Sequence, residues 1–187
     1  SIVSALAPPC TPNQPMAHWT IPSAAPNPPD LAGGVPTTKA TNVVTATTST
    51  TGSVGGAVID NNASDGDGFG WNVYGLNGAA TSNQALDFVI DTRHYTNVKM
   101  VYHAVNVGGA NGPTYTYLYY NNGGGLTQIY SATLPSQSTW ITATAYFTGV
   151  TSATSNTTFR ITGAGAKNAG SSAGMTVDDI SFTGCSN

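Results

Sequence analysis

Residues 114–120 of this 187-residue chain read TYTYLYY. Successive side chains of a β-strand point to opposite faces of the sheet, so every second residue shares a face. The odd-numbered set in this stretch is Tyr115, Tyr117 and Tyr119. The stretch therefore predicts a strand with one aromatic face.

The sequence on both sides of this stretch has the same organisation. Short segments rich in β-branched and aromatic residues alternate with turn clusters such as NNASDGDG, LNGAATSN, NNGGG and GAGAKNAGSSAG. Many short strands with such punctuation indicate an all-β, jelly-roll-like antiparallel β-sandwich. The further strands are predicted near residues 55–60, 69–75, 84–91, 96–107, 126–133, 139–148, 156–163 and 174–183.

The composition supports the all-β prediction and excludes one class of partner. Charged residues make up 7% of the chain, and all eight acidic residues are aspartates. Glu, Lys and Arg are the usual residues of exposed helix faces, so their scarcity argues against surface helices. The five basic residues are scattered and the net charge is −3. We expect no nucleic-acid partner, because no basic patch exists to neutralise phosphates.

The N-terminal part differs in composition from the rest. Nine of the eleven prolines lie within residues 1–37, which predicts an extended arm and no sheet element there. Such an arm needs a surface to lie on: its own domain or a neighbouring molecule. Residues 38–52 have strand composition, and pairing with the chain's own sheet is favoured over pairing with another copy. The predicted organisation is an arm at 1–52, with a strand that copies could exchange, and a sandwich domain at 53–187.

Two cysteines, Cys10 and Cys185, lie near the two ends of the chain. With this composition we expect them to form a disulfide, as in secreted proteins. Closing so long a loop is worth roughly 4–5 kcal/mol in the chain-entropy model. No apolar run approaches the ~20 residues of a transmembrane helix. The start at Ser1 fits a mature protein after signal cleavage, so the predicted location is extracellular or at the cell surface.

Four motifs in the sandwich region carry a family resemblance. They are GWNV at 70–73, ALDFVID at 85–91, TTFRITGAGA at 157–166 and MTVDDISFTG at 175–184. With them, residues 58–184 resemble the jelly-roll domains of bacterial extracellular proteins, including carbohydrate-binding modules and secreted surface proteins. The resemblance implies the fold and a secreted location, and it names no ligand.

Two groups of residues are candidates for a structural calcium ion. The loop at 60–68 is rich in the oxygen ligands that calcium takes, although its spacing is not that of an EF-hand. Alternatively, it is a turn whose side chains bond their own backbone. The resemblance suggests a carboxylate of the DDI motif as a further ligand, although neighbouring strand residues should face opposite sides. The candidates are Asp60, Asn62, Asp65, Asp67, Asp178 and Asp179.

Aromatic side chains are the candidates for a glycan or subunit interface. They stack on sugar rings when exposed, and they are simply core when buried. The candidates are Trp19, Trp71, Trp140 and the row of Tyr115, Tyr117 and Tyr119. Asn62 and Asn156 begin N-x-S/T tripeptides, which are candidate glycosylation sites if the producing cell glycosylates.

The sequence favours a non-catalytic protein. His18, His94 and His103 lie apart without metal-ligand spacing, and no phosphate loop is present. Two function classes remain. The first is a secreted structural protein of a surface, matrix or filament that assembles with copies of itself through its arm. The alternative is a carbohydrate-binding module that recognises polysaccharide through surface aromatics. Neither requires a cofactor.

Overall fold

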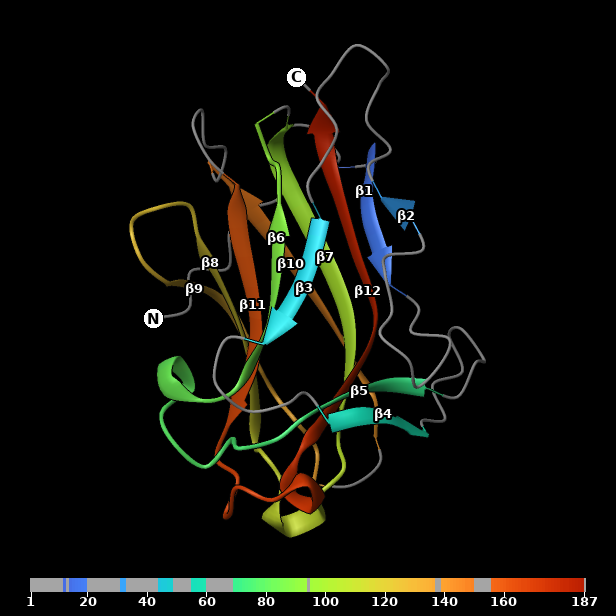
Figure 1. Cartoon of the computed structure of the whole chain (residues 1–187), viewed down its shortest axis with the longest axis vertical. Helices are drawn as coiled ribbons and strands as arrows, with labels where there is room; N and C mark the ends of the chain where they lie inside the picture. Colours follow the sequence, from blue (N-terminus) through green and yellow to red (C-terminus); the bar gives the residue numbers. More distant parts are fainter. Residues whose placement is uncertain are drawn as a thin grey trace.

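The computed structural model consists of two antiparallel sheets packed face to face, as the sequence predicts (Figure 1). It describes residue 12 and residues 14–19, 31–32, 44–48, 55–59, 69–93, 95–136, 139–149 and 156–186. The expected fold class, a jelly-roll-like β-sandwich, is confirmed.

Every strand predicted from residue 53 onward forms, with ends that differ from the prediction by at most three residues. The strands are β1 Gln14–Trp19, β2 Leu31–Ala32, β3 Val44–Thr48, β4 Gly55–Ile59, β5 Phe69–Val73, β6 Ala85–Ile90, β7 Tyr95–Asn106, β8 Tyr115–Asn121, β9 Thr127–Thr133, β10 Ile141–Thr148, β11 Thr157–Ala164 and β12 Met175–Ser186.

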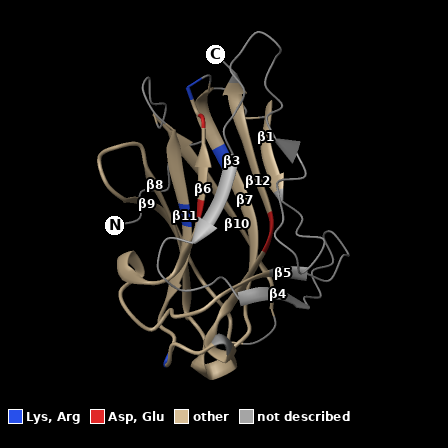
Figure 2. Cartoon of the chain, viewed as in Figure 1, with Lys and Arg blue, Asp and Glu red and all other residues tan. Residues whose placement is uncertain are grey.

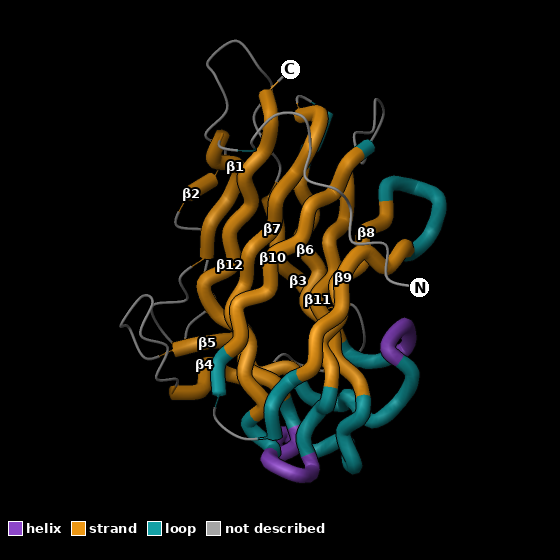
Figure 3. The backbone as a smooth tube through the Cα atoms, turned by 180° about the vertical axis from the view of Figure 1, so that it is seen from behind, coloured by secondary structure: helices purple, strands orange, loops and turns teal. Residues whose placement is uncertain are grey.

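The two sheets have different orders and different numbers of strands. The seven-stranded sheet runs β10-β7-β12-β1-β2, and β5 with its neighbour β4 joins it alongside β12. The five-stranded sheet runs β3-β6-β11-β8-β9. Figure 3 shows the two layers from behind, with loops and short helical turns gathered at one end. The aromatic strand β8 therefore lies inside the smaller sheet, between β11 and the edge strand β9.

Strand β1 is a sheet element that the proline-rich composition did not predict. It pairs antiparallel with β12, and β2 pairs with β1, so the expectation of no sheet element in residues 1–37 is wrong for Gln14–Trp19 and for Leu31–Ala32. Pro15 is tolerated because the register of β1 on β12 shifts between Pro15 and Ala17. Strand β3 pairs with β6 of the same chain, as favoured for residues 38–52.

An aromatic chain fills the space between the sheets. Phe88, Phe182, Phe159 and Phe147 follow one another with ring centroids 4.8–5.7 Å apart. Tyr102 of β7 crosses the core to β8, where its hydroxyl and that of Thr116 lie 2.6 Å apart. Contacts between rings at tilted and edge-on angles are favourable beyond the area they bury. The core is continuous between the two sheets, so the outer faces of both sheets rest on the same packed interior.

The helical content of the described residues is limited to three short 3-10 turns: η1 Ala80–Ser82, η2 Gly109–Asn111 and η3 Ser171–Ala173. No helix in this part of the chain has the length and apolarity needed to cross a bilayer.

Candidate functional site

The outer face of β8 carries the predicted row of tyrosines. Thr116 and Leu118 are fully buried toward the core, whereas Tyr115 on the outer face is 45% exposed. The rings of Tyr115 and Tyr117 lie 6.2 Å apart, and those of Tyr117 and Tyr119 are also 6.2 Å apart and stacked. The alternation read from the sequence thus places three rings in one line along the strand.

Exposure falls along this row. Tyr115 is exposed, Tyr117 is half-buried and Tyr119 is only 5% exposed. Burial, together with the neighbouring phenol of Tyr117, raises the pKa of Tyr119. The Tyr119 hydroxyl points to Oε1 of Gln128, 3.5 Å away on β9. Tyr119 therefore supports the ring of Tyr117, and the surface for a ligand is offered by Tyr115 and Tyr117.

An ion pair lies beside the buried end of the row. Arg160 of β11 donates from Nε to Asp87 Oδ1 at 2.7 Å and from Nη2 to Asp87 Oδ2 at 2.8 Å. Arg160 is directly opposite Tyr119 in the β11–β8 register, and Asp87 is opposite Arg160 on β6. The hydrogen bonds to Asp87 raise the pKa of Arg160. Both side chains are mostly buried, at 12% and 18% exposure, so the pair is rigid and charged.

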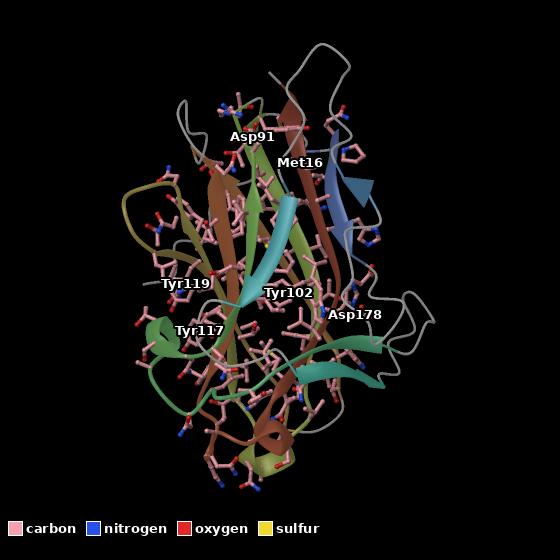
Figure 4. The ribbon with its side chains drawn as sticks, in the orientation of Figure 1. Met16, Asp91, Tyr102, Tyr117, Tyr119 and Asp178 are labelled. Atoms are coloured by element: carbon pink, nitrogen blue, oxygen red, sulfur yellow. The ribbon has the colours of Figure 1, made fainter. Side chains whose placement is uncertain are left out.

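The other side of the row is polar and uncharged. Strand β9 places Thr133 opposite Tyr115, Ser131 opposite Tyr117 and Gln128 opposite Tyr119. Hydroxyl and amide groups can both donate and accept hydrogen bonds. The candidate site, which we call the tyrosine face, is therefore Tyr115, Tyr117 and Tyr119 with these β9 residues and the Asp87–Arg160 pair. Figure 4 labels Tyr117 and Tyr119 of this face.

A tight hairpin holds the two strands of this face together. The side-chain oxygen of Asn121 accepts hydrogen bonds from the backbone N–H groups of Gly123 and Gly125, at 2.8 and 3.2 Å. Both glycines have positive φ, 114° and 93°, a conformation that side chains disfavour. The turn chemistry thus fixes the register of β9 against the tyrosines.

A second cluster lies on the outer face of the seven-stranded sheet. His18 of β1 donates from Nε2 to Asp179 Oδ1 at 2.7 Å, and His103 of β7 places Nε2 3.8 Å from Asp179 Oδ2. Asp179 sits in a β-bulge of β12 with φ 53°, in the left-handed region. The bulge directs one carboxylate between two histidines from different strands.

The bulge also corrects the expected facing of the two aspartates. Core residues of β12 recur at Val177 and then at Ile180, with a spacing of three where a regular strand has two. Asp178 and Asp179 lie between them, so neither belongs to the set of β12 residues that face the core. The sequence argument for opposite faces is wrong because it assumed a regular pleat.

The calcium prediction is not decided by this geometry. Asp178 and Asp179 are described, and Figure 4 shows Asp178 on β12. No group of three or more His, Cys, Asp or Glu residues within the described part could hold a metal ion. These two aspartates therefore do not make a metal site with described acidic or histidine partners. The loop ligands Asp60, Asn62, Asp65 and Asp67 lie outside the described residues.

The tryptophans have a different setting from the tyrosine row. Trp71 packs against the core with its ring 6.0 Å from that of Phe88. Trp140 precedes β10 and is half-buried, and Trp19 ends β1 with its side chain outside the described part. Asn156 precedes β11 and is half-buried, whereas Asn62 is outside the described residues.

Cys185 lies in β12, is 6% exposed and is disulfide-bonded. Its predicted partner Cys10 is outside the described residues, so the pairing of the two stays a prediction. Gln14, four residues after Cys10, is paired with Gly184 in the β1–β12 register.

Sequence reasoning missed both charged clusters. The Asp87–Arg160 pair had a usable signal, because β6 and β11 each contain one charged residue. The bond between His18 and Asp179 joins residues 161 positions apart, and no local pattern announces it.

Comparisons with known proteins find likeness in architecture. No family profile matches the sequence, and no curated protein matches it. A family 35 carbohydrate-binding module from Cellvibrio japonicus is 22% identical over 76% of this chain and 95% of its own, with a TM-score of 0.44. A family 61 module, solved with β-1,4-galactotriose, is 10% identical over 75% and 88%, with a TM-score of 0.44. An adhesin domain of Lys-gingipain from Porphyromonas gingivalis is 11% identical over 62% and 74%, with a TM-score of 0.43. No function of this chain follows from likenesses at this level.

Proposed function

We infer that the chain is a secreted, non-catalytic carbohydrate-binding domain that holds a polysaccharide against its tyrosine face. The observation that carries this proposal is the row of three tyrosines on β8. Side-chain exposure increases along the row from the buried Tyr119 to Tyr115, which is 45% exposed. Contiguous exposed apolar surface marks interaction sites on soluble proteins, whereas single exposed residues are ordinary.

The chemistry around the row supports a sugar ligand. The apolar faces of sugar rings pack on aromatic rings, while their hydroxyls need donors and acceptors close by. Tyr115 and Tyr117 supply the first, and Ser131 and Thr133 on the neighbouring strand supply the second. The position on a paired, hydrogen-bonded sheet fixes the rings before binding, which limits the entropy lost on association.

The proposal requires no cofactor. A structural calcium ion bound through the aspartate loop stays a prediction, as does the absence of catalysis. Assembly with copies of the chain through an exchanged arm is also still a prediction. Strands β1 and β3 both pair within their own chain, so no contact of the described residues favours exchange.

The experiment is retardation of the protein in native gels that contain soluble polysaccharides, followed by calorimetry on the strongest ligand. Tyr115→Ala and Tyr117→Ala should each weaken binding about tenfold, since each removes a stacking surface worth ~1 kcal/mol or more. The matched control is Tyr146→Ala, because Tyr146 is a half-buried tyrosine at an outward position of β10 in the other sheet.

Two results would contradict the proposal. One is that the folded wild-type protein is retarded by no polysaccharide in a broad panel, at millimolar sensitivity in sugar units. The other is that Tyr146→Ala weakens binding as much as Tyr115→Ala and Tyr117→Ala do.

A further inference from the structure

We propose, building on the glycan-binding function above, that the tyrosine face selects an uncharged polysaccharide chain and that Asp87 enforces this selection by neutralising Arg160. The proposal assigns a ligand class to the face and a specificity-determining role to a residue that does not belong to the aromatic row.

The first support is the distribution of charge over the sheet. The five strands β3, β6, β11, β8 and β9 contain one acidic and one basic residue in total, Asp87 and Arg160. Figure 2 shows how sparse charges are across β6, β11, β8 and β9. Outside the strands, Lys167 lies exposed in the loop after β11. The sheet itself therefore presents equal and opposite charge.

The second support is the geometry of the pair. Both carboxylate oxygens of Asp87 accept a hydrogen bond from Arg160, at 2.7 and 2.8 Å. A bidentate pair of this kind is stronger and more directional than a single contact. The guanidinium is thereby held against the sheet, with its charge compensated, instead of reaching toward a ligand.

The third support is the position of the pair relative to the row. Arg160 is opposite Tyr119, which stacks on Tyr117. A chain lying on Tyr115 and Tyr117 thus runs toward a cation that is already neutralised. An anionic sugar at this end would approach Arg160, whose charge is already compensated by Asp87 on the next strand, and would find no uncompensated cation on the strands. An uncharged sugar gives up no electrostatic attraction at this position. The preference therefore arises because the binding of anionic chains is disfavoured.

The test compares one uncharged and one anionic polymer for each variant. The probes are the uncharged polysaccharide retained most strongly in the gel panel and polygalacturonate, at low and at physiological salt. Wild type should bind the uncharged chain and bind polygalacturonate at least tenfold more weakly. Asp87→Asn removes the compensating charge while keeping an oxygen that accepts from Arg160. It should strengthen polygalacturonate binding by roughly threefold to fivefold at low salt, and less at physiological salt, because salt ions screen the solvent-exposed carboxylates of the polymer.

Two matched variants separate local from general charge effects. Asp179→Asn changes the net charge by the same amount on the opposite sheet, and asparagine tolerates the positive φ of this position. It should leave polygalacturonate binding unchanged. The double variant Asp87→Asn with Arg160→Gln removes both charges and should return to the wild-type preference. Circular dichroism and urea unfolding show whether each variant is folded.

The outcomes distinguish this inference from the function on which it rests. Retention of no polysaccharide by folded wild type overturns the binding function itself. Binding of polygalacturonate as strong as that of the uncharged chain overturns the selection alone. An equal gain from Asp87→Asn and Asp179→Asn, or a gain that persists in the double variant, overturns the role of Asp87.

Discussion

The two outer faces of the sandwich use the same backbone geometry for different purposes. The five-stranded sheet keeps the period of two along β8, although the register of β8 with β9 shifts between Leu118 and Tyr119. Three tyrosines line up on β8 with ring centroids 6.2 Å apart. The seven-stranded sheet breaks its pleat at the β12 bulge, where Asp179 contacts His18 of β1. A regular strand offers a surface to a partner, whereas the bulge turns a carboxylate toward the chain's own N-terminal strand. One face therefore carries the proposed ligand surface, and the other holds β1 through Asp179.

The largest expected effect tests what ties the N-terminal part to the seven-stranded sheet. Cys185→Ser should lower the free energy of unfolding by about 4 kcal/mol, because the predicted disulfide to Cys10 would close nearly the whole chain and constrain the unfolded state. Urea unfolding of oxidised and reduced protein measures it, and the reduced wild type is the control. Cys10→Ser should cause the same loss. A Cys10→Ser variant with wild-type stability would show that Cys185 has another partner.

The second effect tests whether β1 belongs to the core. Met16 is fully buried where β1 shifts register on β12, and a Cβ placed at Gly184 would lie 2.9 Å from its sulfur. Met16→Ala should cost about 2–4 kcal/mol, because tightly packed surroundings leave a cavity. Val107→Ala, at a side chain that is 39% exposed, should stay within about 0.5 kcal/mol. Equal stability of Met16→Ala and wild type would mean that β1 only lies on the surface.

The third effect concerns the bond that joins the two sheets across the core. Tyr102→Phe should cost about 1 kcal/mol at pH 7, since it removes one hydrogen bond to Thr116. Burial raises the pKa of Tyr102 well above its ordinary value near 10. The folded state therefore favours the protonated phenol. The stabilising contribution of the Tyr102 phenol is complete below about pH 10. It is lost as the pH rises toward the raised pKa of Tyr102 in the folded state.

Urea unfolding of both proteins at pH 7, 9 and 11 measures this dependence. The stability difference between wild type and Tyr102→Phe should narrow between pH 9 and 11. Burial also raises the pKa of Tyr119 and Tyr130, but these residues are common to both proteins and cancel in the comparison. A difference that stays constant up to pH 11 would contradict the assignment.

The regular face could be predicted from the sequence to a much greater extent than the interrupted one. The alternation at 114–120 predicted both the strand and the residues that share its outer face, because a period of two depends only on local geometry. It could not predict that Tyr119 is buried, because the exposure of a ring depends on its surroundings in space. In β12 the apolar residues lie at 175, 177, 180 and 182, and the spacing of three between 177 and 180 indicates a bulge in the sequence itself. The sequence does not indicate that His18 is the partner of Asp179, because that contact depends on the pairing of the first strand with the last.

The smallest expected effect separates the contribution of the His18–Asp179 hydrogen bond to the stability of β1 from the contribution of packing. His18→Asn shortens the side chain by one methylene relative to glutamine and removes the imidazole, so the hydrogen bond to Asp179 Oδ1 is lost. Because His18 is 36% exposed, the cost should be about 0.5–1 kcal/mol. His103→Asn should cost less, since the ring nitrogen of His103 is 3.8 Å from Asp179. Hydrogen exchange of residues 14–19 gives a sharper readout than global unfolding, since release of β1 speeds exchange there without opening the sandwich. Faster exchange in His18→Asn, with binding to the tyrosine face unchanged, would show that the two faces act independently. Exchange as slow as in wild type would mean that Met16 holds β1 without help from the histidine.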